Sequence, residues 1–394
     1  MQRRKFINNG IALGSALAMG PSLLASAQQK PLKVGVIGTG SRGTGLMRLM
    51  NKIDGYSLVG CADTLPFRLK NGLEIAPEAR GFEDYRALLD RKDIDAVVIA
   101  TPFSTHDEVA NAAIQAGKHV FCEKTMAKGI SEIQSVIDLE KRSDKVFQTG
   151  HQYHSSLLYK KAVKIIQSGY IGEVTAVHCQ WNRNGNWRRP VEDEKYERLI
   201  NWRMYKEYSG GLVAELMSHQ IDFINWFSGS LPAKFTGFGG IDHWKDGRET
   251  HDNIHLLMEY DNGMDASFTC TTTNSFEDYK IKVLGSKATL ILDYTTAVIY
   301  AESKELKETG LVDGVSGATI KAWEAGKGAP VEAPGNDPTI DALKQFHASV
   351  TENKPIISDI KTGATTAKCV QISLDCLYEG TIKYWKDYPE LNFA

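Results

Sequence analysis

The feature that most constrains the fold of this chain is a group of three spaced glycines that directly follows an apolar segment near its start. Residues 32–37 lead into Gly38-Thr-Gly40-Ser-Arg-Gly43, and a stretch that can form a helix follows. This order of strand, Gly-x-Gly-x-x-Gly turn and helix is typical of a Rossmann fold that binds a dinucleotide. The helix amides are expected to face the phosphate charge. We therefore expect the cofactor to contact Gly38, Gly40, Ser41, Arg42 and Gly43.

A carboxylate follows the second apolar segment. Residues 56–62 are predicted to form the second strand, and Asp63 lies 20 residues after Gly43. A carboxylate at this place accepts hydrogen bonds from the adenosine ribose hydroxyls and repels a 2′-phosphate, so the sequence favours NAD over NADP. The alternative is that Asp63 only caps the end of the strand.

Up to about residue 150 the pattern alternates between strands and helices. This alternation predicts a doubly wound parallel sheet over residues 31–150. The expected strands are 33–38, 57–62, 95–100, 119–123 and 146–150. Ligands of such sheets bind beyond the carboxyl ends of the strands. We therefore expect further cofactor contacts from Thr101, Pro102, His106, Glu123 and Lys124.

A second α/β domain is expected over residues 151–394. A helix at 155–168 precedes alternating strands at 253–260, 264–272, 279–284 and 288–293, and Asp-Asn-Gly at 261–263 indicates a hairpin. These strands predict a large open sheet that is mostly antiparallel. Helices are expected at 338–353 and 362–385, where they can pack back on the first domain, and a surface excursion at 303–335.

The first 27 residues resemble a twin-arginine export signal. Arg3 and Arg4 precede a weakly apolar run over residues 11–24, and Ala-Ser-Ala at 25–27 offers a cleavage site. The run is too short and too weakly apolar to span a membrane. Because this route carries folded proteins, we expect a soluble periplasmic protein exported with its cofactor bound. The alternative is a basic tail on a cytoplasmic enzyme.

Composition narrows the classes of partner. A net charge of −2 gives no reason to expect nucleic acid or an anionic membrane surface as a partner. The six cysteines are scattered without the pair spacing of metal or redox sites, so we expect buried free thiols and no bound metal, with a disulfide left open.

One helix carries the residues best suited to proton transfer. Ser209-Gly-Gly opens a predicted helix in which Glu215, His219 and Asp222 share one face. Carboxylates one turn either side of a histidine can orient it and raise its basicity, which suits proton removal from an alcohol. The alternative is a solvated helix face with an ordinary ion pair.

The order of these motifs resembles the glucose–fructose oxidoreductase / inositol dehydrogenase (Gfo/Idh/MocA) family from about residue 31 onward. The resemblance implies a Rossmann domain, then an α/β domain whose open sheet forms a homodimer or homotetramer contact. It also implies that Lys124 corresponds to the lysine of the family's Glu-Lys-Pro motif, near the nicotinamide. Glu215 and His219 correspond to the family's Asp–His proton-transfer pair. The chain departs from the pattern at Thr125, at Glu215 and at Ser209, which stand for proline, aspartate and glycine.

Two segments dense in Trp, Arg and Asn, residues 181–189 and 201–203, fit a carbohydrate site, because aromatic faces stack on sugars and Arg and Asn reach hydroxyls. Nucleic acid or a packed loop with cation–π pairs are the alternatives. The predicted substrate contacts are His151, Tyr153, Asn184, Trp187, Arg188, Arg189, Trp202, Arg203, His219 and Asp222.

These features predict an NAD-dependent oxidoreductase that oxidises a sugar or glycoside at its 3-hydroxyl, with tightly bound NAD that a second sugar regenerates in place. Lys124, His219 and Glu215 are the expected catalytic residues. One alternative is an NAD-dependent glycosidase like the α-N-acetylgalactosaminidases of the family, which oxidises, eliminates, adds water and reduces. A separate lyase acting on the keto product, or a non-catalytic NAD- and sugar-binding protein, also stays open.

Overall fold

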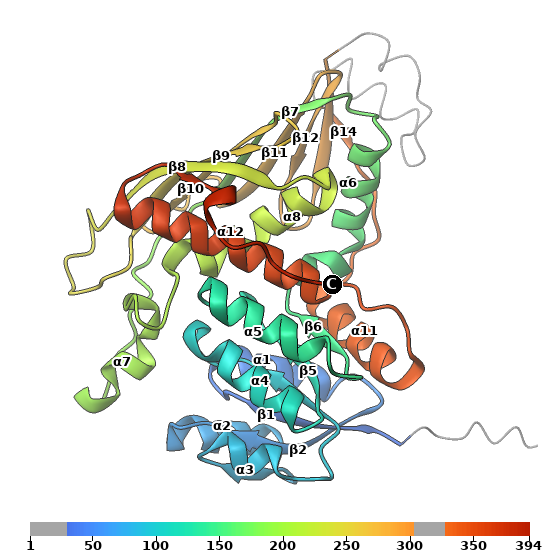
Figure 1. Cartoon of the computed structure of the whole chain (residues 1–394), viewed down its shortest axis with the longest axis vertical. Coiled ribbons are helices and arrows are strands. Elements are labelled where there is room, and N and C mark those ends of the chain that lie inside the picture. Colours follow the sequence, from blue (N-terminus) through green and yellow to red (C-terminus); the bar gives the residue numbers. More distant parts are fainter. Residues whose placement is uncertain (1–29, 303–327) are drawn as a thin grey trace, which may run out of the picture. The chain divides into compact units, whose positions relative to one another are not determined.

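Two sheets organise the computed structural model, which describes residues 30–302 and 328–394 (Figure 1). The expected export signal, and most of the surface excursion expected at 303–335, lie outside the described residues. From Pro31 onward the chain forms one unit of contacting elements.

The first sheet, sheet A, is parallel throughout and has the strand order β3-β2-β1-β4-β5-β6 of a Rossmann fold. Its central strands are continuous apolar runs because helices cover both faces. The expected doubly wound sheet is confirmed, although β3 was missed because three residues carry no pattern. The strands are β1 Leu32–Ile37, β2 Tyr56–Ala62, β3 Arg80–Phe82, β4 Ala96–Ile99, β5 His119–Cys122 and β6 Phe147–Thr149.

Helices alternate with these strands as the sequence pattern predicts. Strand order reverses between β1 and β4, and the carboxyl ends of β1, β2, β4 and β5 therefore open toward one crevice. The helices of this part are α1 Ser41–Met50, α2 Pro66–Ile75, α3 Tyr85–Leu89, α4 His106–Gln115 and α5 Ile130–Glu140.

The second sheet, sheet B, has nine strands in the order β14-β13-β12-β11-β7-β10-β9-β8-β15. It is largely antiparallel as expected, except that β7 and β10 run parallel. The β9–β10 hairpin turns at Gly263, whose φ is +83°, a conformation that glycine adopts without strain. The strands are β7 Val174–Trp181, β8 Pro232–Gly240, β9 Asn253–Tyr260, β10 Asp265–Thr271, β11 Tyr279–Gly285, β12 Ala288–Leu292, β13 Ala297–Ala301, β14 Ala329–Pro330 and β15 Lys383–Tyr384.

One face of sheet B is apolar and packs on helices (Figure 1). Along β9 buried and exposed side chains alternate strictly, which is the pattern of a half-buried strand. The helices of this part are α6 Leu157–Gln167, α7 Glu197–Ile200, α8 Ser218–Ser228, α11 Pro338–Glu352 and α12 Ile360–Glu379.

The last two long helices, α11 and α12, pack against sheet A, and α12 also packs in the core beside sheet B. Phe346 of α11 packs edge-on against Phe121 of β5, with ring centroids 5.7 Å apart, and Ala364 and Ala367 of α12 lie in a core cluster of sheet A. The predicted helix over 362–385 in fact ends at Glu379, because Gly380 takes a φ of +66° and caps it.

All six cysteines are buried free thiols. Within the described ranges, no helix is both long and apolar enough to cross a membrane.

Candidate functional site

The glycine turn, residues 38–43, joins β1 to α1 and shows why each glycine is there. A Cβ on Gly38 would lie 2.6 Å from the Ala100 carbonyl oxygen, and a Cβ on Gly43 would lie 1.9 Å from that of Gly38. At Gly40 the same Cβ would meet only Arg68 side-chain atoms, at 3.7–3.9 Å. The protein itself therefore does not require glycine at residue 40, and close approach by a ligand explains it. No side chain caps α1, which leaves its first amides to an anion.

Asp63 directly follows β2, beside this turn. One carboxylate oxygen accepts hydrogen bonds from Thr39 N at 2.8 Å and Thr39 Oγ1 at 3.3 Å, and the other accepts from Leu65 N at 2.9 Å. A carboxylate has about four lone-pair sites, so Asp63 keeps acceptor capacity for ribose hydroxyls. Together with the glycine turn, this donor and acceptor set fits a dinucleotide.

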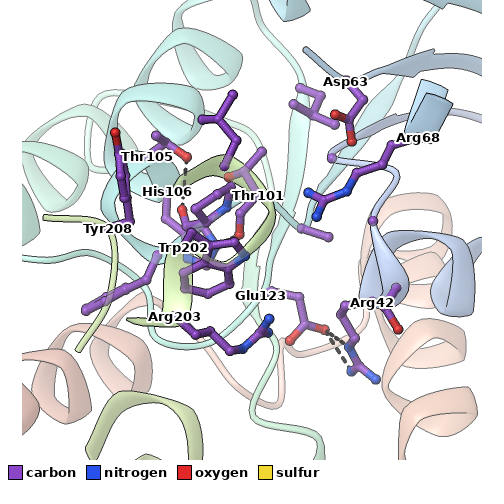
Figure 2. Close-up of a pocket in the computed structure, with 18 of the residues that line it drawn as sticks. Arg42, Asp63, Arg68, Thr101, Thr105, His106, Glu123, Trp202, Arg203 and Tyr208 are labelled. Atoms are coloured by element: carbon purple, nitrogen blue, oxygen red, sulfur yellow. Dashed lines mark hydrogen bonds and ion pairs between the residues drawn. The ribbon is translucent and has the colours of Figure 1, made fainter. Parts of the chain in front are cut away.

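A pocket of about 520 Å³ runs along these strand ends, within the size range of small-molecule sites (Figure 2). It brings together most of the residues predicted to bind the cofactor and four predicted to bind substrate. Gly43 does not line it and acts through packing instead. Its lining includes the predicted residues Gly38, Gly40, Ser41, Arg42, Asp63, Thr101, Pro102, His106, Glu123, Lys124, Arg189, Trp202, Arg203, Glu215 and His219.

Two polar contacts brace the pocket floor. Arg42 donates from Nε at 2.8 Å and from a terminal nitrogen at 2.7 Å to the buried Glu123 (Figure 2). The buried His106 ring lies between the Thr125 carbonyl oxygen, at 2.8 Å, and that of Thr101, at 3.0 Å. Burial lowers the pKa of His106. His106 therefore ties the loops after β4 and β5 to each other.

Lys124 reaches across to the segment that precedes α8. Its Nζ donates to the carbonyl oxygens of Ala214 at 3.1 Å and Glu215 at 2.9 Å. These oxygens lie in a π-helical turn, Val213–Met217, where the Ser218 amide bonds to Val213 and bypasses Ala214. The wide turn thus leaves the Ala214 carbonyl oxygen without the amide donor of an α-helix, and Lys124 shares that oxygen with the hydroxyls of Ser218 and Thr125. Burial lowers the pKa of Lys124, and Glu215 works against that shift.

Glu215 pairs with an arginine and not with His219. Its Oε2 accepts a hydrogen bond from Arg203 Nε at 2.7 Å. Burial raises the pKa of Glu215, but Arg203 and then Lys124 outweigh burial, and the net shift is downward. The expectation that Glu215 orients His219 is therefore wrong, because the π-helical turn replaces the expected i, i+4 geometry and Arg203 takes the carboxylate.

His219 is buried and its Nδ1 has no hydrogen-bond partner among the described residues. Burial, then Lys124, His151 and Arg42, lower its pKa well below the ordinary value. The expectation that flanking carboxylates raise its basicity is therefore wrong. The ring rests against Tyr153, with centroids 5.0 Å apart. His219 is held by packing and stays neutral near pH 7.

Asp222 is hydrogen-bonded to a different histidine, His154. Its carboxylate oxygens lie 2.9 and 3.1 Å from His154 Nε2, and all of these groups are buried away from the pocket. Burial raises the pKa of Asp222, but His154 and His151 outweigh it and the net shift is downward. The predicted face shared with His219 therefore does not place Asp222 at the site.

The remaining predicted substrate residues divide into two groups. His151 and Tyr153 are buried behind His219 and do not line the pocket. Trp187 and Arg188 line an adjoining pocket with Arg183, while Asn184 is exposed and bridges to Thr273. Trp187 has a φ of +63°, which is uncommon for a residue with a side chain.

Several pocket residues were not among the predicted site residues. Arg68 follows Asp63 by five positions, in the first turn of α2, and Tyr208 directly precedes the Ser-Gly-Gly turn. Each of these two residues is close in sequence to a predicted motif, and this proximity could have identified them as site residues. Gln152 and the apolar pair Leu199 and Ile200 also line the pocket, and their sequence neighbourhood carries no signal for this.

Comparisons with known proteins agree with this architecture. Residues 32–151 match the family model described as oxidoreductase family, NAD-binding Rossmann fold. Residues 159–291 match the model of the GFO/IDH/MocA C-terminal domain. The expected family resemblance and the expected NAD cofactor are confirmed.

Two relatives each match about two thirds of the chain. An uncharacterized oxidoreductase of Streptococcus pneumoniae serotype 4 is 30% identical over 269 residues, which are 66% of this chain and 68% of that protein. The 2,7-anhydro-N-acetylneuraminate hydratase of Escherichia coli K12 is 29% identical over 266 residues, again 66% and 68%. The solved structure of levoglucosan dehydrogenase with NADH and levoglucosan shares the fold, with a TM-score of 0.73 at 20% identity over 90% of this chain and 99% of that one. The chain thus belongs to the GFO/IDH/MocA family of oxidoreductases with an NAD-binding Rossmann domain.

Proposed function

We propose that this chain oxidises a sugar or glycoside, at the 3-hydroxyl, and that the NAD stays bound and is regenerated in place by a second sugar or keto-sugar. The observation that carries the proposal is the presence of Lys124 and His219 in the same pocket as the glycine turn and Asp63. When bound, NAD supplies the hydride acceptor. The protein's residues must then place a hydroxyl and take its proton.

Lys124 is suited to hold the reacting hydroxyl. An ammonium has three N–H donors, and two of those on Lys124 go to Ala214 and Glu215. The third is left for a substrate oxygen. The anchored ammonium would withdraw electron density from that oxygen and make its proton easier to remove.

His219 is suited to accept the proton. Its lowered pKa keeps the imidazole neutral near pH 7, so a nitrogen lone pair is free to take a proton. Glu215 acts on a different group, since its carboxylate offsets the charges of Lys124 and Arg203. In this proposal Glu215 sets the electrostatic balance of the pocket and is a positioning residue.

The sugar would lie between these groups and the aromatic side of the pocket. Trp181 and Trp202 line the pocket beside Arg183 and Arg203 (Figure 2 labels Trp202 and Arg203). Arg203 stacks over Trp202 at 4.2 Å, and Arg183 stacks over Trp181 at 5.6 Å. Flat aromatic faces next to fixed donors are the elements that recognise sugar rings and hydroxyls.

The cellular location and the oligomeric state of the enzyme belong to the same proposal. The twin-arginine motif supports export to the periplasm with the cofactor bound. We expect no free NAD pool there, so regeneration of the bound NAD by a second sugar would be required for turnover. A homodimer or homotetramer through the open sheet fits this family assignment.

The test uses the purified mature protein without added nucleotide. Absorbance in the reduced-nicotinamide band is recorded while α- and β-glycosides are added, and the products are identified. Wild type should give a band change and a 3-keto sugar. Lys124→Ala should abolish turnover and keep NAD binding, while Lys344→Ala, an exposed lysine of α11 outside the pocket, should behave as wild type.

Each other outcome has a defined meaning. Release of free sugar without a lasting band change would favour the oxidation–elimination glycosidase. A keto-glycoside that accumulates would leave elimination to a partner lyase. Turnover that survives Lys124→Ala would refute the assigned chemistry, and no response to any sugar would favour a binding protein.

A further inference from the structure

A long connection between β7 and the π-helical turn, residues 182–208, forms an arm that contains α7 (Figure 1). The arm supplies seven of the residues that line the pocket. Its contributing residues are Arg183, Arg189, Leu199, Ile200, Trp202, Arg203 and Tyr208. Sheet B therefore sends a segment over a pocket whose other residues come mainly from the Rossmann part.

The arm is fastened to the Rossmann part at three places. Tyr196 packs edge-on against Phe67 of α2, with centroids 5.8 Å apart. Lys128 donates from Nζ to the Glu207 carbonyl oxygen at 2.9 Å, and to that of Lys206. The Ser104 amide donates to the Tyr208 carbonyl oxygen at 3.2 Å. These contacts hold the arm against the Rossmann part of the chain.

Inside the arm, Asn201 fixes the backbone of Arg189. The Asn201 side chain is buried, accepts from the Arg189 amide at 2.7 Å and donates to the Arg189 carbonyl oxygen at 3.0 Å. It also donates to Glu197 of α7 at 2.8 Å. The position of Arg189 therefore follows from the fold of the arm.

Arg189 and Arg68 are two cations that converge on the glycine turn. Both line the main pocket and a neighbouring pocket whose lining includes Gly40 and Ser41. Arg68 atoms are those a Cβ on Gly40 would meet. Burial lowers the pKa of Arg68, Asp63 raises it, and Arg189 and Arg203 lower it again, which shows that the arginines repel one another.

Neighbouring carboxylates offset this pair only in part, since Asp63 acts on Arg68. Arg42 is bound to Glu123 and Arg203 to Glu215. Among the residues that the structure describes, Arg68 and Arg189 have no ion pair with a carboxylate, although Asp63 faces Arg68 from the end of β2 (Figure 2). Two repelling cations beside uncapped helix amides form a site for a doubly charged anion.

We propose that the arm closes over the bound dinucleotide and that Arg189, with Arg68, pairs with its pyrophosphate, so that the dinucleotide is retained between turnovers. This assigns Arg189 to the cofactor instead of the substrate. It deepens the proposed regeneration of bound NAD, which needs a cofactor that leaves slowly, and it rests on that part of the proposed function.

The test measures release of NADH without any sugar. The full chain is loaded with NADH, mixed with excess NAD, and the loss of bound-nicotinamide fluorescence is timed. Arg189→Ala should speed release about 10- to 100-fold, as expected for loss of a charge-assisted hydrogen bond. Arg142→Ala removes the same charge from an exposed position after α5 and should change release less than twofold. Tyr196→Ala should loosen the arm and speed release about 2- to 10-fold.

Release from Arg189→Ala at the wild-type rate would overturn the proposal. Circular dichroism melting checks that each variant is folded, and Arg189→Gln, which keeps the side-chain length without the charge, replaces an alanine variant that fails to fold. Wild-type protein that exchanges its NADH within one turnover time would also overturn it. Because no sugar is present, a failure to oxidise sugars would leave this result unaffected.

Discussion

Replacing Gly40 by alanine separates what the fold needs from what the cofactor needs. A Cβ at this residue finds only Arg68 side-chain atoms at 3.7–3.9 Å, and the φ of −69° suits alanine. Alanine restricts the unfolded chain, which contributes about 0.4–1 kcal/mol, but it is a poorer N-cap for α1 than glycine by a similar amount, so the free energy of unfolding should change by less than about 1 kcal/mol. The same methyl group would lie where the pyrophosphate must approach. Overpacking of about 1–3 kcal/mol corresponds to roughly a 5- to 150-fold increase in Kd for NAD.

Two other glycines serve as controls. A Cβ on Gly43 would lie 1.9 Å from the Gly38 carbonyl oxygen, so Gly43→Ala should lower stability by about 3 kcal/mol or more and lose binding through the fold. Gly45 lies in α1 with nothing within 4 Å of its Cβ, so Gly45→Ala should stabilise by about 0.5–1 kcal/mol and leave the Kd unchanged.

The assay combines urea unfolding without nucleotide and calorimetric titration with NAD of protein stripped of its cofactor. A Gly40→Ala variant that unfolds like wild type and binds NAD with the wild-type Kd would refute the glycine turn as the pyrophosphate site. A variant that loses much more than about 1 kcal/mol would show that the packing around residue 40 does not tolerate a methyl group.

Three further results are expected. Asp63→Ser should narrow the preference for NAD over NADP, because the carboxylate that repels a 2′-phosphate is removed; the ratio of the two Kd values measures this, and an unchanged ratio would contradict it. Asp222→Asn should lower the free energy of unfolding by about 1–3 kcal/mol, because a neutral amide replaces the buried carboxylate that is bonded to His154 Nε2, and a loss below about 0.5 kcal/mol in urea unfolding would contradict that. The depressed pKa of His219 means the unfolded chain binds its proton more readily, so stability should rise with pH up to about 6.5. His219→Gln should make the free energy of unfolding depend less steeply on pH. An unchanged slope would show that other groups cause the pH dependence.

Local patterns predicted the parts of the molecule that depend on local chemistry. The glycine turn, the apolar strands of sheet A and the β9–β10 hairpin were foreseen because glycine conformations and side-chain periodicity act within a few residues. Strand β3 escaped because it has only three residues, and the end of α12 was placed too late because the cap at Gly380 was overlooked. The fold class therefore followed from the sequence almost completely.

The site was predicted less completely because its pairings are set by tertiary contacts. Helical spacing placed Glu215 and Asp222 around His219, yet Arg203 takes the first carboxylate and His154, 68 positions away, takes the second. The π-helical turn that frees the Ala214 carbonyl oxygen for Lys124 has no sequence signature that we recognised.

The most direct test of the proposed function follows the hydrogen on C3 of the substrate. A glycoside carrying deuterium at C3 is mixed in a single turnover with protein that retains its NAD, and the nucleotide is then extracted for mass spectrometry. Deuterium should appear on the reduced nicotinamide of the wild type and should be absent with Lys124→Ala. Deuterium that stays on the sugar or exchanges into water, from protein that demonstrably binds the glycoside, would contradict oxidation at C3.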